Sequence, residues 1–261
     1  MGHERTGSLP KSQRWRDLVE QIAHFGAPGD QIPDIARQTL RNVRSRLRQI
    51  DRDTGVKAAF EFLLNLAVAL RSQNAQQALS ATGIQASGQP TPLSLAKALS
   101  GWVAARQGSA EYGGIAQGAA ADAIAEWSRK RQDQGRLFSA TDDPFEAWHD
   151  MGTGSGFCEV ARLYFARLTE RHLNYYLERE ASAVLPSIEE RDNFQKHLRQ
   201  HLEEISQHAF ETARITQSFA AGWFNRNTAR GVPGDKEITG FLLRAFGKIR
   251  EELLREAENN G

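Results

Sequence analysis

Residues 56–72 read VKAAFEFLLNLAVALRS and are apolar on nearly every side when drawn as a helix. The polar side is one narrow line, formed by Lys57, Glu61 and Asn65 at intervals of four residues. A helix of this kind is stable only where other elements cover it on most sides. We therefore expect residues 56–72 to form a helix at the centre of the hydrophobic core.

Helical periodicity continues on both sides of this segment. Residues 33–51, 93–107, 114–134 and 235–258 carry apolar side chains at intervals of three and four residues. No segment shows the alternation of apolar and polar residues that is typical of strands. The prolines leave long proline-free intervals between them: Pro10, Pro28, Pro33, Pro90, Pro92, Pro144, Pro186 and Pro233. The sequence therefore predicts an all-α protein.

A loop is expected at residues 80–92, which read SATGIQASGQPTP. Small and polar residues with two prolines are typical of turns and linkers. We place a domain boundary near residue 85. Residues 1–85 then form a smaller N-terminal helical subdomain with an arginine-rich helix, and residues 86–261 form a C-terminal helical bundle.

Two long helices are expected in the C-terminal part. The first is predicted at residues 157–185, after a turn at residues 152–156 that reads GTGSG. The second starts with a capping box, because Ser187 and Glu190 have the required spacing, and it extends to about residue 227. Its apolar seam has heptad-like spacing, which suits antiparallel packing against the first helix. The seam consists of Leu198, Leu202, Ile205, Ala209, Thr212, Thr216, Phe219 and Trp223.

Composition and charge narrow the class of protein. The chain has a formal net charge of +1 and one cysteine, Cys158. Binding to nucleic acid or to a membrane surface would therefore depend on local patches. One cysteine excludes a disulfide scaffold, and the sequence contains neither a membrane-spanning apolar run nor an apolar leader. We expect a soluble, cytoplasmic protein.

An arginine stripe is the first candidate for a functional surface. Arg46 lies beside a line of arginines with helical spacing along residues 33–51, which consists of Arg37, Arg41, Arg44, Arg48 and Arg52. Guanidinium groups in this arrangement can contact successive phosphates of DNA or RNA, or an acidic protein partner. The alternative is a solvated charged face, because arginine is the usual cation of this chain.

A histidine stripe is the second candidate. Five ligand-type side chains share one face of the helix that follows Ser187: His197, His201, Glu204, His208 and Glu211. Two histidines one turn apart can chelate a divalent metal such as zinc. The preceding helix offers three further side chains of this type: Glu159, Glu170 and His172. The alternative is that these residues are the polar flanks of a bundle helix.

The third candidate is the adjacent pair His149 and Asp150, which a Met-Gly dipeptide follows. This pair resembles the metal-binding motif of the HD-type metal phosphohydrolases, which are also all-helical. The resemblance implies that His149 and Asp150 bind a divalent metal that generates hydroxide. The sequence departs from the family pattern at two places, since it has no histidine between residues 25 and 148 and has Thr153 where a lysine is expected.

Taken together, these patterns favour a non-catalytic interaction or scaffold subunit of an intracellular, bacterial complex. Its long helices would form the assembly surface, and the arginine stripe would contact phosphates. No cofactor is expected under this hypothesis, and no membrane partner. Two alternatives stay open: a metal-dependent HD-like phosphohydrolase, and a purely structural homo-oligomer.

Overall fold

The computed structural model describes residues 12–25, 31–42, 50, 52–84, 90–106, 108–135, 145–211 and 219–259. Every regular element in these ranges is a helix, as the sequence predicts. The elements are α1 (Gln13–Ala23), α2 (Ile32–Asn42), α4 (Thr54–Ala69), α5 (Ala75–Ala81), α6 (Pro92–Ala104), α7 (Ala110–Gly135), α8 (Glu146–His149), η1 (Asp150–Gly152), α9 (Gly154–Val184), α10 (Ile188–Glu211), α11 (Phe219–Asn227) and α12 (Asp235–Asn259).

Helix α4 lies in the interior, where its apolar sequence places it. It packs against α6, α7, α9 and α12, and most of its side chains are buried. Asp53 caps its first turn by accepting hydrogen bonds from the backbone N–H groups of Gly55 and Val56, at 2.8 and 3.1 Å. The prediction of a central helix in this segment is confirmed, with the helix at Thr54–Ala69 instead of residues 56–72.

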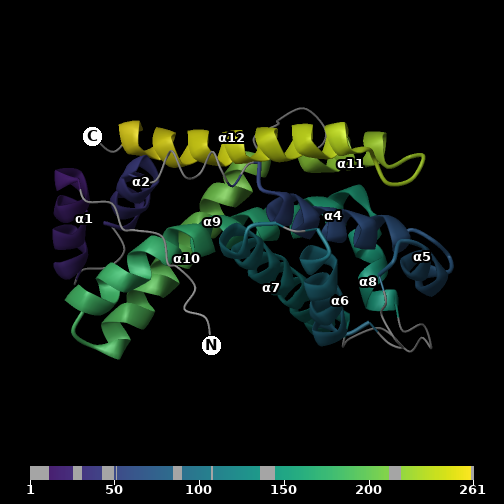
Figure 1. Ribbon diagram of the computed structural model, residues 1–261, viewed down its shortest axis with the longest axis horizontal. Coiled ribbons are helices and arrows are strands. Elements are labelled where there is room, and N and C mark those ends of the chain that lie inside the picture. The colour runs from purple at the N-terminus through teal and green to yellow at the C-terminus, as the bar shows by residue number, and fades with distance from the viewer. Residues whose placement is uncertain are drawn as a thin grey trace.

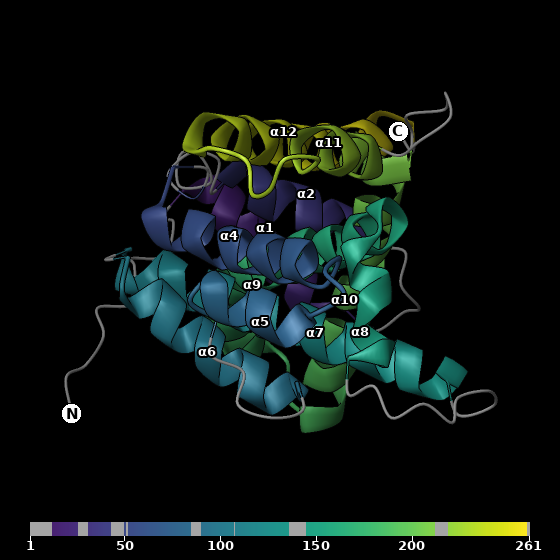
Figure 2. The same ribbon diagram turned by 90° about the vertical axis from the view of Figure 1, so that its right-hand side faces the viewer.

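Helix α9 runs through the middle of the molecule (Figure 1). Helices α1, α2 and α10 surround one end of it, and α4 and α7 pack along the other part. Helix α12 lies across the top and contacts α2, α4 and α10, so it bridges both ends. Figure 2 shows α11 and α12 side by side as an outer layer above α2 and α4. From residue 163 to residue 170, every side chain of α9 is buried.

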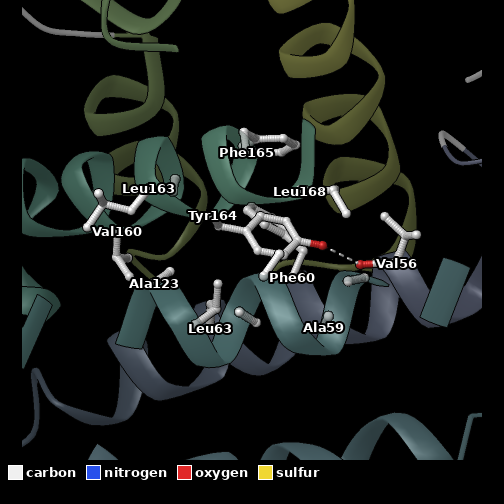
Figure 3. Close-up of a cluster of buried hydrophobic side chains, with 14 of the residues drawn as sticks. Val56, Ala59, Phe60, Leu63, Ala123, Val160, Leu163, Tyr164, Phe165 and Leu168 are labelled. Carbon is white, nitrogen blue, oxygen red and sulfur yellow. Dashed lines mark hydrogen bonds between the residues drawn. The ribbon is translucent and has the colours of Figure 1, made fainter. Parts of the chain in front are cut away.

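Tyr164 anchors α9 to α4 (Figure 3). Its ring is fully buried beside Phe60, and its hydroxyl donates a hydrogen bond of 3.1 Å to the carbonyl oxygen of Val56. Burial raises the pKa of Tyr164, and the negative charge of Asp53 adds to this effect. Tyr164 is therefore a neutral hydrogen-bond donor inside the core.

The predicted boundaries of the long helices differ from the structure at two points. The second helix, predicted to extend to about residue 227, is described as α10 to Glu211 and as a separate helix α11 from Phe219. Helix α9 begins at Gly154, so the glycine-rich segment that was expected to be a turn forms its first turn instead. The reason is a cap, because the Thr153 hydroxyl accepts a hydrogen bond of 3.0 Å from the backbone of Gly156. At the start of α10, the capping box of Ser187 and Glu190 is confirmed by hydrogen bonds in both directions.

The apolar seam predicted for the second long helix is described in part. Leu198, Leu202 and Ile205 are buried on α10, whereas Phe219 and Trp223 lie on the separate helix α11. The side chains of the other three seam residues lie outside the described part: Ala209, Thr212 and Thr216.

One hydrophobic cluster extends from Trp15 to Ile249 and includes residues on both sides of the predicted boundary near residue 85. The division into residues 1–85 and 86–261 stays a prediction. Within the described ranges, none of the helices combines the length and the apolar character that crossing a bilayer requires.

Helices α4 and α7 start so close together that glycine is required there. A Cβ atom at Gly108 would lie 2.4 Å from the Cα atom of Gly55, and one at Gly55 would lie 2.7 Å from the Cα atom of Gly113. Asp53 joins the same two helix starts, since its second carboxylate oxygen accepts a hydrogen bond of 3.1 Å from the backbone of Ser109.

This close approach yields a stability prediction. Gly108→Ala forces the two backbones apart, and we expect the free energy of unfolding to fall by about 1–3 kcal/mol in urea denaturation. Gly101, on the exposed side of α6, is the matched control, because a Cβ atom there meets nothing within 4 Å. Gly101→Ala should raise the free energy of unfolding by about 0.5–1 kcal/mol. Equal effects of the two changes would contradict the proposed contact.

Candidate functional site

The arginine stripe is described at three of its six positions. Arg37 forms an ion pair of 2.5 Å with Asp34 one turn earlier, and Arg41 is exposed near the end of α2. Arg52 is exposed in the turn before α4. Three positions lie outside the described residues: Arg44, Arg46 and Arg48. Nucleic-acid binding by the stripe stays a prediction.

The pair His149 and Asp150 takes part in contacts between helices. The Nδ1 atom of His149 donates a hydrogen bond of 2.9 Å to the carbonyl oxygen of Leu70, which ties α8 to the end of α4. Asp150 forms an ion pair of 3.4 Å with Arg131 of α7. These contacts give both residues a structural role.

The residues of the histidine stripe differ in their surroundings along α10: His197 and His201 are half-buried and Glu204 is exposed. His197 donates a hydrogen bond of 2.8 Å to the carbonyl oxygen of Asn193, and the exposed Glu204 accepts one of 3.0 Å from Gln200. Burial lowers the pKa of His201, and the Glu204 carboxylate opposes this shift. The side chains of His208 and Glu211 lie outside the described part.

The three further ligand candidates are also placed by the structure. His172 is buried between the rings of Tyr112 and Tyr176, Glu159 is paired with Arg131, and Glu170 belongs to the ion-pair cluster described next. Among the described residues, no three His, Cys, Asp or Glu side chains lie together as a group that could bind a metal ion. The HD-like and histidine-stripe metal sites therefore stay untested predictions.

A cluster of ion pairs surrounds Arg167 of α9, and no pattern in the sequence predicts the cluster as a whole. Arg167 is 8% exposed, and its guanidinium forms ion pairs with Glu126 of α7 at 2.7 Å and with Glu170 at 2.8 Å. It also forms a close ion pair with Glu203 of α10. One side chain thus joins three helices.

Burial and charge act in opposite directions in this cluster. Burial alone would lower the pKa of Arg167, but its hydrogen bonds to Glu126 and Glu170 outweigh burial and raise it. Burial alone would raise the pKa of Glu126, but Arg167 and Lys130 bring it below its ordinary value of 4.5. Both groups are therefore charged at neutral pH.

Two further ion pairs beside Arg167 extend the cluster to the surface. Arg199 donates a hydrogen bond of 2.9 Å from Nε to Glu170, and Arg171 forms an ion pair of 2.7 Å with Asp122. The side chains of Arg171 and Arg199 are 42% and 57% exposed. The buried Arg167 and the partly exposed Arg171 of α9 therefore lie beside the exposed Arg199 of α10.

These side chains line an open groove of about 510 Å³ between α7, α9 and α10. Four arginines and three carboxylates form its walls: Arg129, Arg167, Arg171, Arg199, Asp122, Glu126 and Glu203. Arginine forks match carboxylate groups in geometry and charge. The groove, which we call the arginine groove, is therefore suited to an acidic ligand and has no arrangement typical of a nucleophile with its base.

Comparison of the chain with protein-family models, with curated proteins and with solved structures found no match. The assignment of a site consequently rests on the geometry of this chain alone.

The buried pairs of Arg167 lead to a prediction on stability. Arg167→Ala leaves Glu126 and Glu170 with fewer compensating charges in the interior, so we expect the free energy of unfolding at pH 7 to fall by about 3–5 kcal/mol. Arg171→Ala is the control, because Arg171 and its partner Asp122 are 42% and 41% exposed and surface pairs contribute at most about 1 kcal/mol. Urea denaturation of the three proteins measures both effects.

The same comparison has a defined pH dependence. The pKa of Glu126 is lower in the folded chain than its ordinary value of 4.5. Its contribution is therefore complete above pH 4.5 and is lost as the pH falls through the lower folded value. The difference between the wild type and Arg167→Ala should shrink over that acidic range. A pH-independent difference, or an equal loss in Arg171→Ala, would contradict the buried ion-pair account.

Proposed function

We propose that this protein is a non-catalytic interaction subunit and that the arginine groove binds an acidic segment of a protein partner. The observation that carries the proposal is the pair of half-exposed arginines at the mouth of the groove, Arg171 and Arg199. Each is joined to one carboxylate of the chain, Asp122 and Glu170 respectively.

The donor inventory of these arginines supports the binding of further carboxylates. Arg199 uses its Nε atom on Glu170, and no hydrogen bond joins its two terminal amino groups to a described residue. Arg171 directs Nε and Nη2 at the same oxygen of Asp122. An arginine has five N–H donors, so both side chains can donate hydrogen bonds to an incoming carboxylate while they keep their present partners.

Charge at the mouth of the groove also favours an acidic partner, because Arg199 is 57% exposed whereas its carboxylate partner Glu170 is buried. Over the whole cluster the charges balance. Four arginines face three carboxylates in the lining of the groove, and the fourth carboxylate of the cluster, Glu170, is 3% exposed beneath them. Ion pairs at a surface contribute little to stability, so the pair of Arg171 with Asp122 can rearrange at small cost.

Rigidity of the walls is a further support. Arg167 connects the three helices that form the groove, and its contacts are buried. A binding surface that is ordered before the partner arrives loses less conformational entropy on binding. We include in this proposal the predicted antiparallel arrangement of the two long helices, α9 and α10, as the frame on which the complex assembles.

The proposal predicts salt-sensitive binding of an acidic peptide. Fluorescence anisotropy with a labelled oligoglutamate peptide should show saturable binding to the full chain at low salt and weaker binding as salt is added. The double change Arg171→Glu and Arg199→Glu should weaken binding by at least about tenfold, because it removes two charge-assisted contacts and adds repulsion.

The matched control is the double change Arg14→Glu and Arg16→Glu on α1, which alters the net charge equally at two exposed arginines remote from the groove. Far-UV circular dichroism should show that both variants are folded. Absence of saturable binding by the wild type, or equal weakening in both double variants, would contradict the proposal.

A further inference from the structure

Residues of α11 and α12 line a second groove. These two helices form the outer layer of the molecule in Figure 2. The groove encloses about 310 Å³, at the lower end of the range of sites for small molecules. Its lining combines aromatic, cationic and acidic side chains: Phe219, Trp223, Arg226, Asn227, Glu237, Phe241 and Arg244.

The floor of this groove is a stack of aromatic rings. The rings of Phe219 and Phe241 are 4.9 Å apart and inclined by 6°, and Trp223 lies 4.5 Å from Phe241. Phe241 is buried and contacts the core rings Phe60 and Phe157, whereas Phe219 and Trp223 are half-buried. The floor is thus fixed by the core and presents aromatic surface to a ligand.

The rim of this groove carries two arginines that have no ion-pair partner among the described residues. Arg226 and Arg244 are exposed, and neither forms an ion pair with a described residue. The guanidinium of Arg244 and the ammonium of Lys248 lie 5.9 and 5.8 Å from the centre of the Phe219 ring. Glu237, also exposed, supplies a carboxylate in the same groove.

The arrangement differs from the other arginines that lie over aromatic rings. Arg71 lies over Phe224, but three of its nitrogens donate hydrogen bonds to η1 and to the end of α11. Arg106 lies over Trp102 and is paired with Glu61. Those arginines have structural roles, whereas Arg226 and Arg244 are available for a ligand.

From this geometry we propose that the groove between α11 and α12 binds a nucleoside monophosphate. Arg226 and Arg244 contact the phosphate, because guanidinium groups bind phosphate oxygens in a bidentate manner. The exposed parts of Trp223 and Phe219 contact the base, as aromatic side chains do with any nucleobase. Glu237 accepts hydrogen bonds from the ribose hydroxyls.

This site is separate from the arginine groove and does not depend on the proposed function. The two grooves have no lining residue in common. Each can therefore be tested with variants that leave the other unchanged.

Isothermal titration of the full chain with adenosine monophosphate tests the inference. We expect saturable binding, and a loss of affinity of at least about tenfold in Arg226→Gln and in Arg244→Gln, since each removes a charge-assisted contact. Arg16→Gln is the matched control, because it removes one exposed arginine on α1 and should bind as the wild type does.

Two further ligands separate the parts of the site. Inorganic phosphate and adenosine should each bind more weakly than adenosine monophosphate, and Trp223→Ala should weaken the nucleotide but leave phosphate binding unchanged. No saturable binding of adenosine monophosphate would overturn the inference. So would equal binding of phosphate and nucleotide, equal affinity of the Arg226→Gln and Arg16→Gln variants, or binding of single-stranded RNA without binding of the mononucleotide.

Discussion

Complete burial of two turns of α9 constrains the rest of the structure. Every side chain from residue 163 to residue 170 is buried, and this segment includes Tyr164, Arg167, Thr169 and Glu170. A buried polar group destabilises the fold unless it has a hydrogen-bond partner, and a buried charge needs an opposite charge. Neighbouring helices must therefore bring specific groups to fixed places: the Val56 carbonyl of α4 to Tyr164, and carboxylates of α7 and α10 to Arg167.

These contacts explain how buried ion pairs and exposed arginines occur in the same structure. Arg167 of α9 uses its charge inside the molecule, whereas Arg171 of α9 and Arg199 of α10 place theirs at the surface. On the opposite layer, the aromatic stack under α12 fixes α11 and leaves Arg226 and Arg244 exposed. Among the described residues, charge is thus paired in the interior where the helices cross and is exposed where they face solvent.

The sequence predicts best those features that depend on neighbouring residues. The helix at residues 56–72 follows from its own apolar pattern, and the start of α10 follows from Ser187 and Glu190. The start of α9 lies three residues before the expected start at Phe157, because the cap at Thr153 lets the glycines form the first turn of the helix.

The candidate sites depend on residues that are distant in the chain, which a local pattern cannot indicate. The spacing of the histidines on α10 places them on one face, but their surroundings are set by other helices. The ion pairs of Arg167 join residues 126, 167 and 203 on three helices. The sequence does indicate the ion pair within α9, because Arg167 and Glu170 lie one turn apart between apolar residues. The packing of α7 and α10 against α9 determines which carboxylates pair with Arg167.

Because α9 packs against most of the other helices, we expect the described helices to unfold together as one cooperative unit. Urea denaturation followed by tryptophan fluorescence and by far-UV circular dichroism tests this claim most directly, because the tryptophans lie on five different helices: Trp15, Trp102, Trp127, Trp148 and Trp223. We predict one transition with the same midpoint for both signals. Two separate transitions, with helix lost in one and fluorescence in another, would contradict the account.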